Sequence, residues 1–533
     1  MSVRRCARGV RLLAAAALSA FLATAASAQT LTIGVRAGPE SIDPHFTATG
    51  THAEALKHIF DTLVWSGDQL QLEPRLAESW RPIGPTTWEF RLRRGVRFHD
   101  GSEFTAEDVK FSIERMPMVS GPNPTTIYVR QVREVRIVDP HTVHIETHQP
   151  APTLPNDFVR VFVVSHRAAA GLTRENANAA FNAGRAAVGT GPYRFVSWTP
   201  REELVLERFD GFWGEREPWQ RVVRREIPND SARVAQLRAG QVDMIVRVPA
   251  ADVPTLERDQ RLLTVRAPTI YVFNMDFDFR ERSPQVFARD GSPLPQNPLR
   301  DARVREAFDL AMDRQALAEV AMEGMGRPEG QMVTQGIFGF IPDYPILRPN
   351  LQRARQLLTE AGYPNGFRVQ LSFSIDRLPG DRQVGLAIVQ MLARIGIDAQ
   401  ANGQPITVVF PARTRGEYSM TMLGWGTLTG EAHYTYSSLG HTNDRATGLG
   451  AFNWRGYSNP QLDDVLQRAG RELDDARRTA LLHEAGRLYL SERISIPLVS
   501  VGTAWSMRRD RVRMIRTRSD EDTLAMDLRP PAR

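Results

Sequence analysis

The chain has 533 residues, 42% of them hydrophobic and 24% charged, a composition typical of soluble globular proteins. The formal charge is +6, and it falls to +2 (63 − 61) without the four arginines between positions 4 and 11. This balance gives no reason to expect nucleic acid or an anionic membrane as a partner, and about 505 residues beyond the leader are too many for one hydrophobic core.

The first 28 residues are typical of a secretory signal. The arginines precede an apolar run over 12–26, and small residues follow up to Ala28. The run of about 15 residues is shorter than the roughly 20 of a membrane-spanning helix. We expect cleavage after Ala28 and a periplasmic mature chain, with an uncleaved anchor as the alternative and the export route left open.

Cys6 is the only cysteine, and it lies inside this leader. We therefore expect no disulfide, no thiolate nucleophile and no cysteine-based metal site in the mature chain.

Residues 73–187 are expected to form an α+β unit. Alternating apolar residues predict strands at 88–92, 132–138 and 143–147, and Thr105 can cap a helix. His144, Glu146 and His148 share one face of the third strand. They suit a divalent metal, but the pattern is more typical of a solvent-facing strand edge.

Two extended apolar stretches, 267–277 and 494–505, lie far apart in the sequence. A pair of such crossings is what a hinge between two lobes requires.

The segment 350–410 predicts α/β structure. Asn350 caps a helix that ends at Gly362, a strand covers 367–375, a second helix covers 384–395, and a second strand covers 406–410. Strand, helix and strand at this spacing form a β-α-β unit with parallel strands.

The segment 418–457 is rich in aromatic residues and glycine without a clear periodic pattern. Loops of this composition commonly line ligand sites. For Trp425 and Trp454, packing in the core is an equally good interpretation.

Local motifs for catalysis are missing from the sequence. It has no Gly-x-Ser-x-Gly elbow, no Ser-x-x-Lys, no phosphate-binding loop and no His-Glu-x-x-His. We expect a binding protein without catalytic residues, metal or cofactor, and a secreted hydrolase is the rival hypothesis.

Several stretches together resemble one known family. They are Leu-Glu-Pro-Arg-Leu-Ala-Glu-Ser-Trp at 72–80, Trp-Glu-Phe-Arg-Leu-Arg at 88–93, Gly-Val-Arg-Phe-His-Asp-Gly at 95–101, Thr-Ala-Glu-Asp-Val at 105–109 and Tyr-Ser-Asn-Pro at 457–460. In these the chain is similar to the bacterial extracellular solute-binding proteins of family 5. That family includes receptors for dipeptides, oligopeptides, glutathione, opines and nickel chelates.

The resemblance implies an α/β fold of two lobes that close on a ligand, the first with an extra α+β domain. We expect domain I at 29–72, 188–268 and 500–533, the inserted domain at 73–187 and lobe two at 269–499. It also implies a monomer that captures a peptide or peptide-like solute and delivers it to ABC permease subunits in the inner membrane. A receptor for a metal chelate, opine or glutathione is the alternative, with His433 and His441 as candidates for a chelate.

One position departs from the peptide receptors. Their Gly-Trp pair is followed by an aspartate that holds the α-ammonium of the peptide, whereas Gly424-Trp425 here leads to Leu428. Glu431 is the nearest acidic substitute, and otherwise the ligand has no free amine at this place. The expected ligand-binding residues are Trp425, Glu431, His433, Tyr434, Trp454, Tyr271, Asn274 and Phe46.

Overall fold

The computed structural model describes residues 30–119, 121, 125–375, 377–444 and 447–531. The expected signal and its cleavage site lie outside these residues. In the described part of the chain, no helix is long and apolar enough to cross a membrane.

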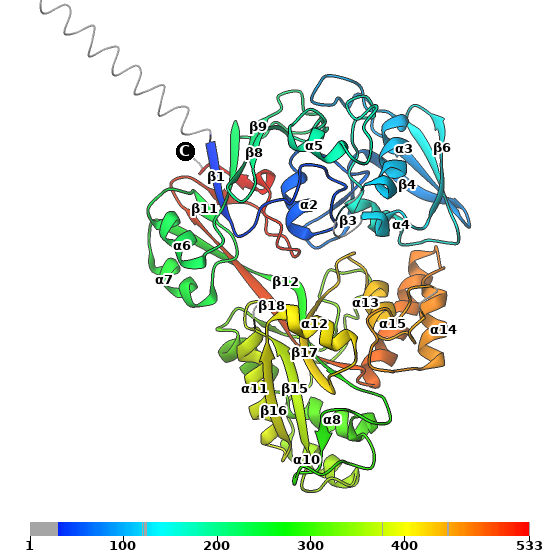
Figure 1. Cartoon of the computed structure of the whole chain (residues 1–533), viewed down its shortest axis with the longest axis vertical. Coiled ribbons are helices and arrows are strands. Elements are labelled where there is room, and N and C mark those ends of the chain that lie inside the picture. Colours follow the sequence, from blue (N-terminus) through cyan, green and yellow to red (C-terminus); the bar gives the residue numbers. More distant parts are fainter. Residues whose placement is uncertain (1–29, 120, 122–124, 376, 445–446, 532–533) are drawn as a thin grey trace, which may run out of the picture.

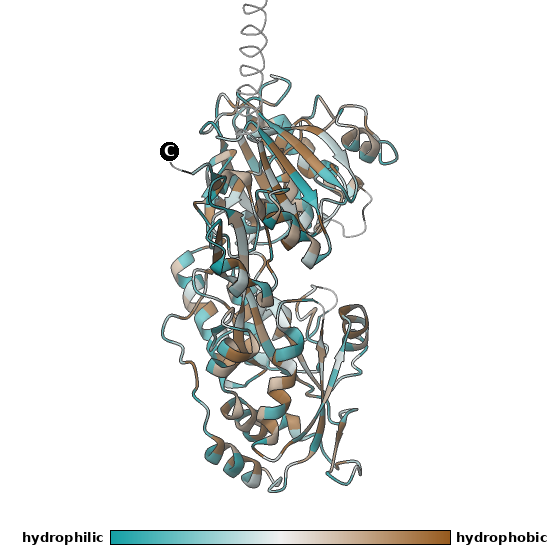
Figure 2. Cartoon of the chain, turned by 90° about the vertical axis from the view of Figure 1, so that its left-hand side faces the viewer, coloured by the Kyte–Doolittle hydropathy of each residue, from teal (hydrophilic) through white to brown (hydrophobic). Residues whose placement is uncertain are grey.

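Two lobes make up the molecule, and two long antiparallel strands run from one to the other (Figure 1). These strands are β12 (Leu262–Phe277) and β18 (Ser495–Arg508). They confirm the two crossings that the sequence predicts. Figure 2 shows the lobes stacked one above the other, with apolar residues recurring along the strands of both.

A twelve-stranded sheet passes through both lobes because β12 and β18 belong to each of them. In lobe one, β18 continues through β11, β1, β10, β9 and β8, and in lobe two β12 continues through β17, β15 and β13. The remaining strands of this sheet are β1 (Thr30–Val35), β8 (Tyr193–Thr199), β9 (Glu203–Arg208), β10 (Arg221–Glu226), β11 (Met244–Ile245), β13 (Val286–Phe287), β14 (Arg327–Pro328), β15 (Arg368–Ser374), β16 (Asp398–Gln404) and β17 (Met420–Gly426).

The pairing of β12 with β18 is irregular between Pro268 and Val272. Before this point β12 pairs with the lobe-one end of β18, and after it β12 pairs with β17 of lobe two. The irregularity therefore lies where the chain passes from one lobe to the other.

Lobe one also contains a separate four-stranded antiparallel sheet of order β4-β5-β7-β6. Its strands are β4 (Ala77–Gly84), β5 (Thr87–Leu92), β6 (Val132–Asp139) and β7 (Thr142–Thr147). The shorter strand pairs of this lobe are β2 (Val64–Ser66) with β3 (Leu72–Pro74) and β19 (Arg513–Met514) with β20 (Leu528–Arg529).

The helices of lobe one are α2 (Gly50–Leu56), α3 (Ala106–Arg115), α4 (Leu154–Asp157), α5 (Ala177–Asn182), α6 (Asp230–Arg238) and α7 (Val253–Arg258). Those of lobe two are α8 (Ala302–Ala311), α9 (Arg314–Ala316), α10 (Leu351–Glu360), α11 (Asp381–Ala393), α12 (Ile406–Thr414), α13 (Ala432–Leu439), α14 (Pro460–Ala469) and α15 (Asp475–Ser491).

The third predicted strand of the inserted unit is central rather than an edge, because β7 pairs with β5 on one side and β6 on the other. Its outer face carries His144, 3.5 Å from Glu89, and Glu146, which is paired with Arg133. This polar face belongs to an internal strand, so the predicted strand edge is wrong.

The predicted β-α-β unit is present as β15, α11 and β16, and β15 and β16 are parallel. Asn350 caps α10 as expected, since its side chain accepts a hydrogen bond from the backbone N–H of Arg353 at 3.0 Å. The prediction of a strand at 406–410 is wrong. The strand is the preceding polar segment 398–404, and residues 406–414 form helix α12.

Each lobe has its own hydrophobic core. In lobe two, strands and helices surround Phe308 and Leu371. In lobe one, one cluster of buried residues includes Trp219 and Trp505, and another includes Phe90. Separate cores leave β12 and β18 as the main covalent links between the lobes, which suits a hinge.

Candidate functional site

A row of aromatic rings lies in lobe two. Trp425, near the end of β17, stacks on Tyr434 of α13 with ring centres 5.4 Å apart and planes 23° apart. Its indole N–H donates to the hydroxyl of Thr435 at 3.0 Å. Phe452 meets Trp425 edge-on at 5.2 Å, and Trp454 meets Phe452 at 5.5 Å. The predicted loop at 418–457 therefore includes a strand and a helix, and Trp425 lies in the strand.

Tyr271 lies beside this row, on the lobe-two side of the irregularity in β12. It pairs in register with Gly426, and a Cβ at Gly426 would lie 2.7 Å from the ring of Tyr271. The guanidinium of Arg377 lies 5.9 Å from the centre of the same ring and donates to the carbonyl of Gly424 at 2.5 Å. Gly426 thus lets the ring of Tyr271 lie close to the strand, and a Cβ at Gly424 would lie 2.2 Å from the side chain of Leu378.

Lobe one approaches lobe two through helix α4 itself. The side-chain amide of Asn156 donates to the carbonyl of Thr429 in lobe two at 2.8 Å. This hydrogen bond joins the two lobes.

Tyrosines from both lobes come close to each other here. Burial raises the pKa of Tyr434 to about 12, and Tyr128 and Tyr271 add to this shift. Tyr128 belongs to lobe one. Burial raises its pKa, Asp157 adds to this shift, and the charge of Arg160 opposes it. We call Tyr128, Arg160, Tyr271, Trp425 and Tyr434 the inter-lobe cluster.

Arg160 ends the 3-10 turn Phe158–Arg160 in lobe one. Burial lowers its pKa, but Tyr128, Asp522, Asp520 and Tyr271 outweigh burial and raise it. The Nη1 atom of Arg160 is buried without a hydrogen-bond partner among the residues that the structure describes. The guanidinium is therefore charged and has donors to offer.

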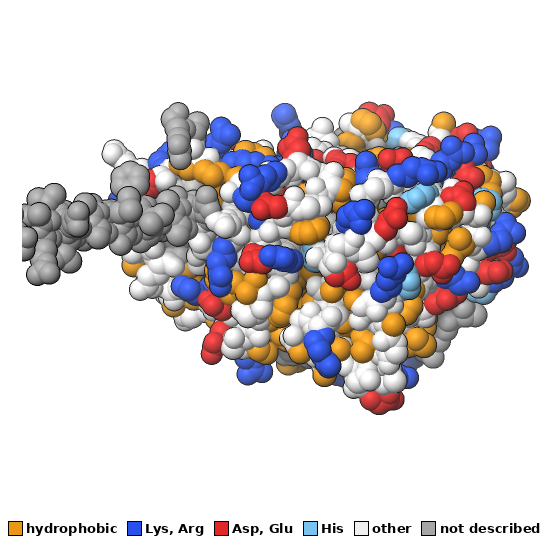
Figure 3. Space-filling model, turned by 90° about the horizontal axis from the view of Figure 1, so that it is seen from above, with side chains coloured by type: hydrophobic (Ala, Val, Ile, Leu, Met, Phe, Trp, Pro, Cys, Tyr) orange, Lys and Arg blue, Asp and Glu red, His pale blue; other side chains and the backbone are white. Residues whose placement is uncertain are grey.

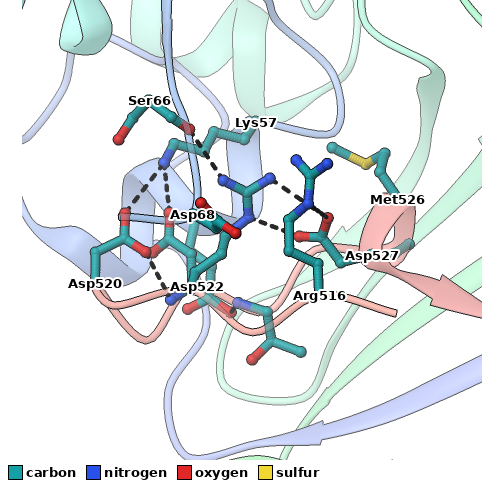
Figure 4. A network of polar contacts seen from close by, with 12 residues as sticks. Lys57, Ser66, Asp68, Arg516, Asp520, Asp522, Met526 and Asp527 are labelled. Carbon is teal, nitrogen blue, oxygen red and sulfur yellow. Dashed lines mark hydrogen bonds and ion pairs between the residues drawn. The ribbon is translucent and has the colours of Figure 1, made fainter. Parts of the chain in front are cut away.

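An acidic segment near the C-terminus completes the lobe-one side (Figure 4). Lys57 binds Asp522 at 2.5 Å and lies 3.6 Å from Asp520. Burial raises the pKa of Asp520, whereas for Asp522 the charge of Lys57 and its neighbours outweighs burial and lowers the pKa. Next to them, Glu521 pairs with Arg247 at 3.2 Å.

The carboxylate of Glu431 is not free to face the inter-lobe cluster. It is 1% exposed, forms an ion pair with Arg478 at 2.5 Å and accepts the backbone N–H of His433 as the cap of α13. Leu428, which was expected at the position of the receptors' aspartate, is 43% exposed. The carboxylate that was expected to receive an amine is engaged within lobe two.

Asp157 of α4, in lobe one, lies close enough to Glu431 to be affected by its charge. Burial raises the pKa of Asp157 to about 8; Arg130 opposes the shift and the negative charge of Glu431 adds to it.

The other expected residues lie apart from the cluster. The Nε2 atom of His433 contacts the carbonyl of Leu466 at 3.0 Å, and Trp454 lies under Arg413 at 4.5 Å. Asn274 is buried in the sheet, where its amide donates to Asp276 at 2.8 Å.

The last expected residue, Phe46, lies in the lobe-one loop after β1, its carbonyl against Gly121. The structure thus groups Tyr271, Trp425 and Tyr434 of the expected set and places Trp454 at the end of the aromatic row. Glu431, His433, Asn274 and Phe46 lie in other surroundings.

Sequence reasoning missed the lobe-one members, Tyr128 and Arg160, and the arginines Arg247 and Arg377. One signal is visible only in the backbone: Arg247 has a φ of 50°, a left-handed conformation that is uncommon for arginine. No sequence pattern distinguishes Arg160 from the many other arginines of this chain.

The two histidines named for a chelate are occupied by protein groups. In His441, Nδ1 contacts the carbonyl of Thr442 at 2.6 Å and Nε2 contacts Gln467 at 3.1 Å. Within the described ranges, no group of three or more His, Cys, Asp and Glu side chains is arranged to hold a metal ion.

Known proteins are similar to this chain over almost its whole length. Residues 71–447 match the family described as bacterial extracellular solute-binding proteins, family 5 Middle. The glutathione-binding protein GsiB of Escherichia coli K12 is 27% identical over 482 residues, 89% of each chain.

Two solved structures show the same fold. HbpA2 of Haemophilus parasuis has a TM-score of 0.80 at 21% identity, covering 94% of this chain and 100% of that one. DppA of Helicobacter pylori, in complex with the peptide STSA, has a TM-score of 0.72 at 22% identity, covering 94% and 98%.

Proposed function

Because the chain belongs to the bacterial extracellular solute-binding proteins of family 5, we propose that its lobes close on a peptide or peptide-like solute. The family supplies the solute-binding component of ABC importers. The protein then hands the solute to permease subunits in the inner membrane.

The inter-lobe cluster is the proposed binding site. The observation that carries this proposal is the approach of tyrosines from both lobes, Tyr128 on one side and Tyr271 and Tyr434 on the other. Aromatic faces give a solute contact area at low entropic cost, and a few polar groups orient it. The stacked ring of Trp425 forms the wall on the lobe-two side.

The domain division proposed for this function places domain I at 29–72, 188–268 and 500–533, the inserted domain at 73–187 and lobe two at 269–499. The separate four-stranded sheet and the irregularity at Pro268 support these boundaries.

We further propose that the chain acts as a monomer, is exported with cleavage after Ala28 and has no catalytic activity. Family 5 binding proteins are periplasmic. Figure 3 shows basic and acidic side chains interspersed over the upper face of lobe one, which supports the absence of a nucleic-acid partner.

Within the family, a glutathione or opine receptor is the second candidate. The relative GsiB, a glutathione-binding protein, favours it by sequence similarity along 89% of both chains. A metal-chelate receptor is less well supported, since His433 and His441 are bound to protein groups.

The decisive experiment identifies the solute and then tests closure. Mass spectrometry of material released from the purified, denatured protein names the candidates, and small-angle scattering measures the radius of gyration with each of them. Binding should compact the protein and add about 2.7 kcal/mol to its stability at a hundred times the dissociation constant. An unchanged radius at saturation, or turnover of the bound solute, would overturn the receptor function.

A further inference from the structure

We propose that the solute of this receptor is an acid, and that Arg160 binds its carboxylate or an equivalent anionic group. This inference rests on the proposed function, because it assigns the chemistry of the solute held between the lobes.

The first step is the state of Arg160 itself. A guanidinium offers five N–H donors in a planar fork that matches a carboxylate. A buried polar atom without a partner costs free energy, and buried donors in proteins are almost always satisfied. Among the described residues the buried Nη1 of Arg160 has no hydrogen-bond partner, and we assign the acceptor that it lacks to the solute.

The second step compares the other arginines of the region. Arg247 is paired with Glu521, and Arg377 donates to the carbonyl of Gly424. Both have acceptors inside the protein. Of these three arginines, Arg160 is the one with a buried nitrogen that has no partner among the described residues.

The third step concerns the acids near Arg160. Asp522 is bound by Lys57 at 2.5 Å, and Asp520 lies 3.6 Å from the same ammonium. Burial and the charge of Asp522 raise the pKa of Asp520, and Lys57, Arg518 and Arg160 oppose this shift. Lys57 makes the direct ion pairs with both acids (Figure 4), whereas Arg160 acts on them through its charge from a longer distance.

The fourth step is the lack of an anion for an ammonium group. After Gly424-Trp425, Leu428 carries no charge, and Glu431 is bound by Arg478. Burial raises the pKa of Asp157 to about 8, so this carboxyl is protonated at neutral pH. A solute amine would be buried without a countercharge, whereas a solute anion would meet Arg160.

The test uses four probes with the mature protein: N-acetyl-trialanine, its C-terminal amide, trialanine amide with a free amine, and glutathione. Calorimetry on wild type should show that the acids bind and that each neutral or cationic amide binds at least about 30-fold more weakly. The variant Arg160→Gln should reduce the affinity for the acids by at least about 30-fold. Arg160→Lys should recover part of it, because the charge is kept.

The matched control is Arg167→Gln, an exposed arginine of the same lobe, which should bind the acids as wild type does. Unfolding curves of all variants check that a loss of affinity does not reflect a loss of fold. Equal affinity of wild type for the acids and their amides, or unchanged affinity in Arg160→Gln, overturns the inference. If the free-amine probe alone binds and compacts the protein, the receptor function stands and the acidic solute does not. If none of the probes and no co-purified solute binds, both fail.

Discussion

At the scale of single residues, Trp425 combines packing with a position at the proposed site. Its ring stacks on Tyr434 and donates to Thr435, so removing it weakens both lobe two and the binding surface. We expect Trp425→Ala to lower the free energy of unfolding by less than the roughly 3–5 kcal/mol of a fully buried ring. It should also weaken solute binding by about 10-fold, measured by calorimetry.

The control is Trp80→Ala, because Trp80 is partly buried in the inserted unit away from the cluster. It should cost stability without changing affinity. Equal affinities of Trp425→Ala and wild type would show that the ring serves packing alone.

The sequence predicts that Glu431 binds an amine of the solute, whereas in the structure it is paired with Arg478. Its pairing with Arg478 predicts that Glu431→Gln leaves a buried guanidinium without its countercharge, which costs about 3–5 kcal/mol of stability. Chemical denaturation measures this loss. The double variant Glu431→Gln/Arg478→Met should recover part of it, since the uncompensated charge is removed.

A different outcome would restore the role that the sequence suggested. If Glu431→Gln keeps its stability and loses affinity only for probes with a free amine, this carboxylate binds the solute directly. The sequence could name Glu431 as the nearest acid after Leu428, but it could not show that an arginine 47 positions later in the chain (478 − 431) occupies it.

At the scale of elements, β18 passes closely over other backbone at Gly502. A Cβ at this position would lie 1.8 Å from the carbonyl oxygen of Met325. We expect Gly502→Ala to shift the strand at the crossing and to lower the free energy of unfolding by more than 1 kcal/mol, measured by denaturation. Gly50→Ala is the control, because nothing lies within 4 Å of its Cβ position and α2 begins there. Equal stabilities of the two variants would contradict the close approach.

The elements show where sequence patterns succeed and where they fail. The crossings, α10, β15 and α11 follow from strict periodicity and capping residues, so their existence is predictable. The strand at 406–410 was predicted from the alternation of Ile406, Val408 and Phe410. In the structure Val408 and Phe410 are exposed, and the buried residues are Val409, Ala412 and Arg413, at the i, i+3 and i+4 spacing of a helix.

The true second strand escaped prediction because it is polar. β16 pairs only with β15, and of its seven residues only Ala399 is buried. An edge strand with one face in solvent needs few apolar residues, so alternation is weak there. The lobe-one half of the site could not be predicted from the sequence either. Arg160 stands out only because its buried Nη1 has no acceptor among the described residues.

At the scale of the whole molecule, the contact between the lobes depends on protonation. Asp157 of lobe one faces Glu431 of lobe two and Arg130, and its pKa is about 8 in the folded protein because of burial. In the unfolded chain the pKa returns to the ordinary value of about 3.8. Between these values the folded protein holds one proton more than the unfolded chain, so stability falls as pH rises.

The stabilisation is fully present below about pH 4 and is lost as pH rises through about 8, at no more than about 1.4 kcal/mol per pH unit. Asp157→Asn keeps the neutral shape without a titrating proton. We therefore expect the variant to lose less stability than wild type between pH 5 and pH 8, measured by chemical denaturation at both. Asp464→Asn, whose side chain is 65% exposed, should follow wild type. If wild type and Asp157→Asn lose the same stability between pH 5 and pH 8, the prediction is wrong. The carboxyl would then ionise freely, and the lobes would meet there with more solvent between them.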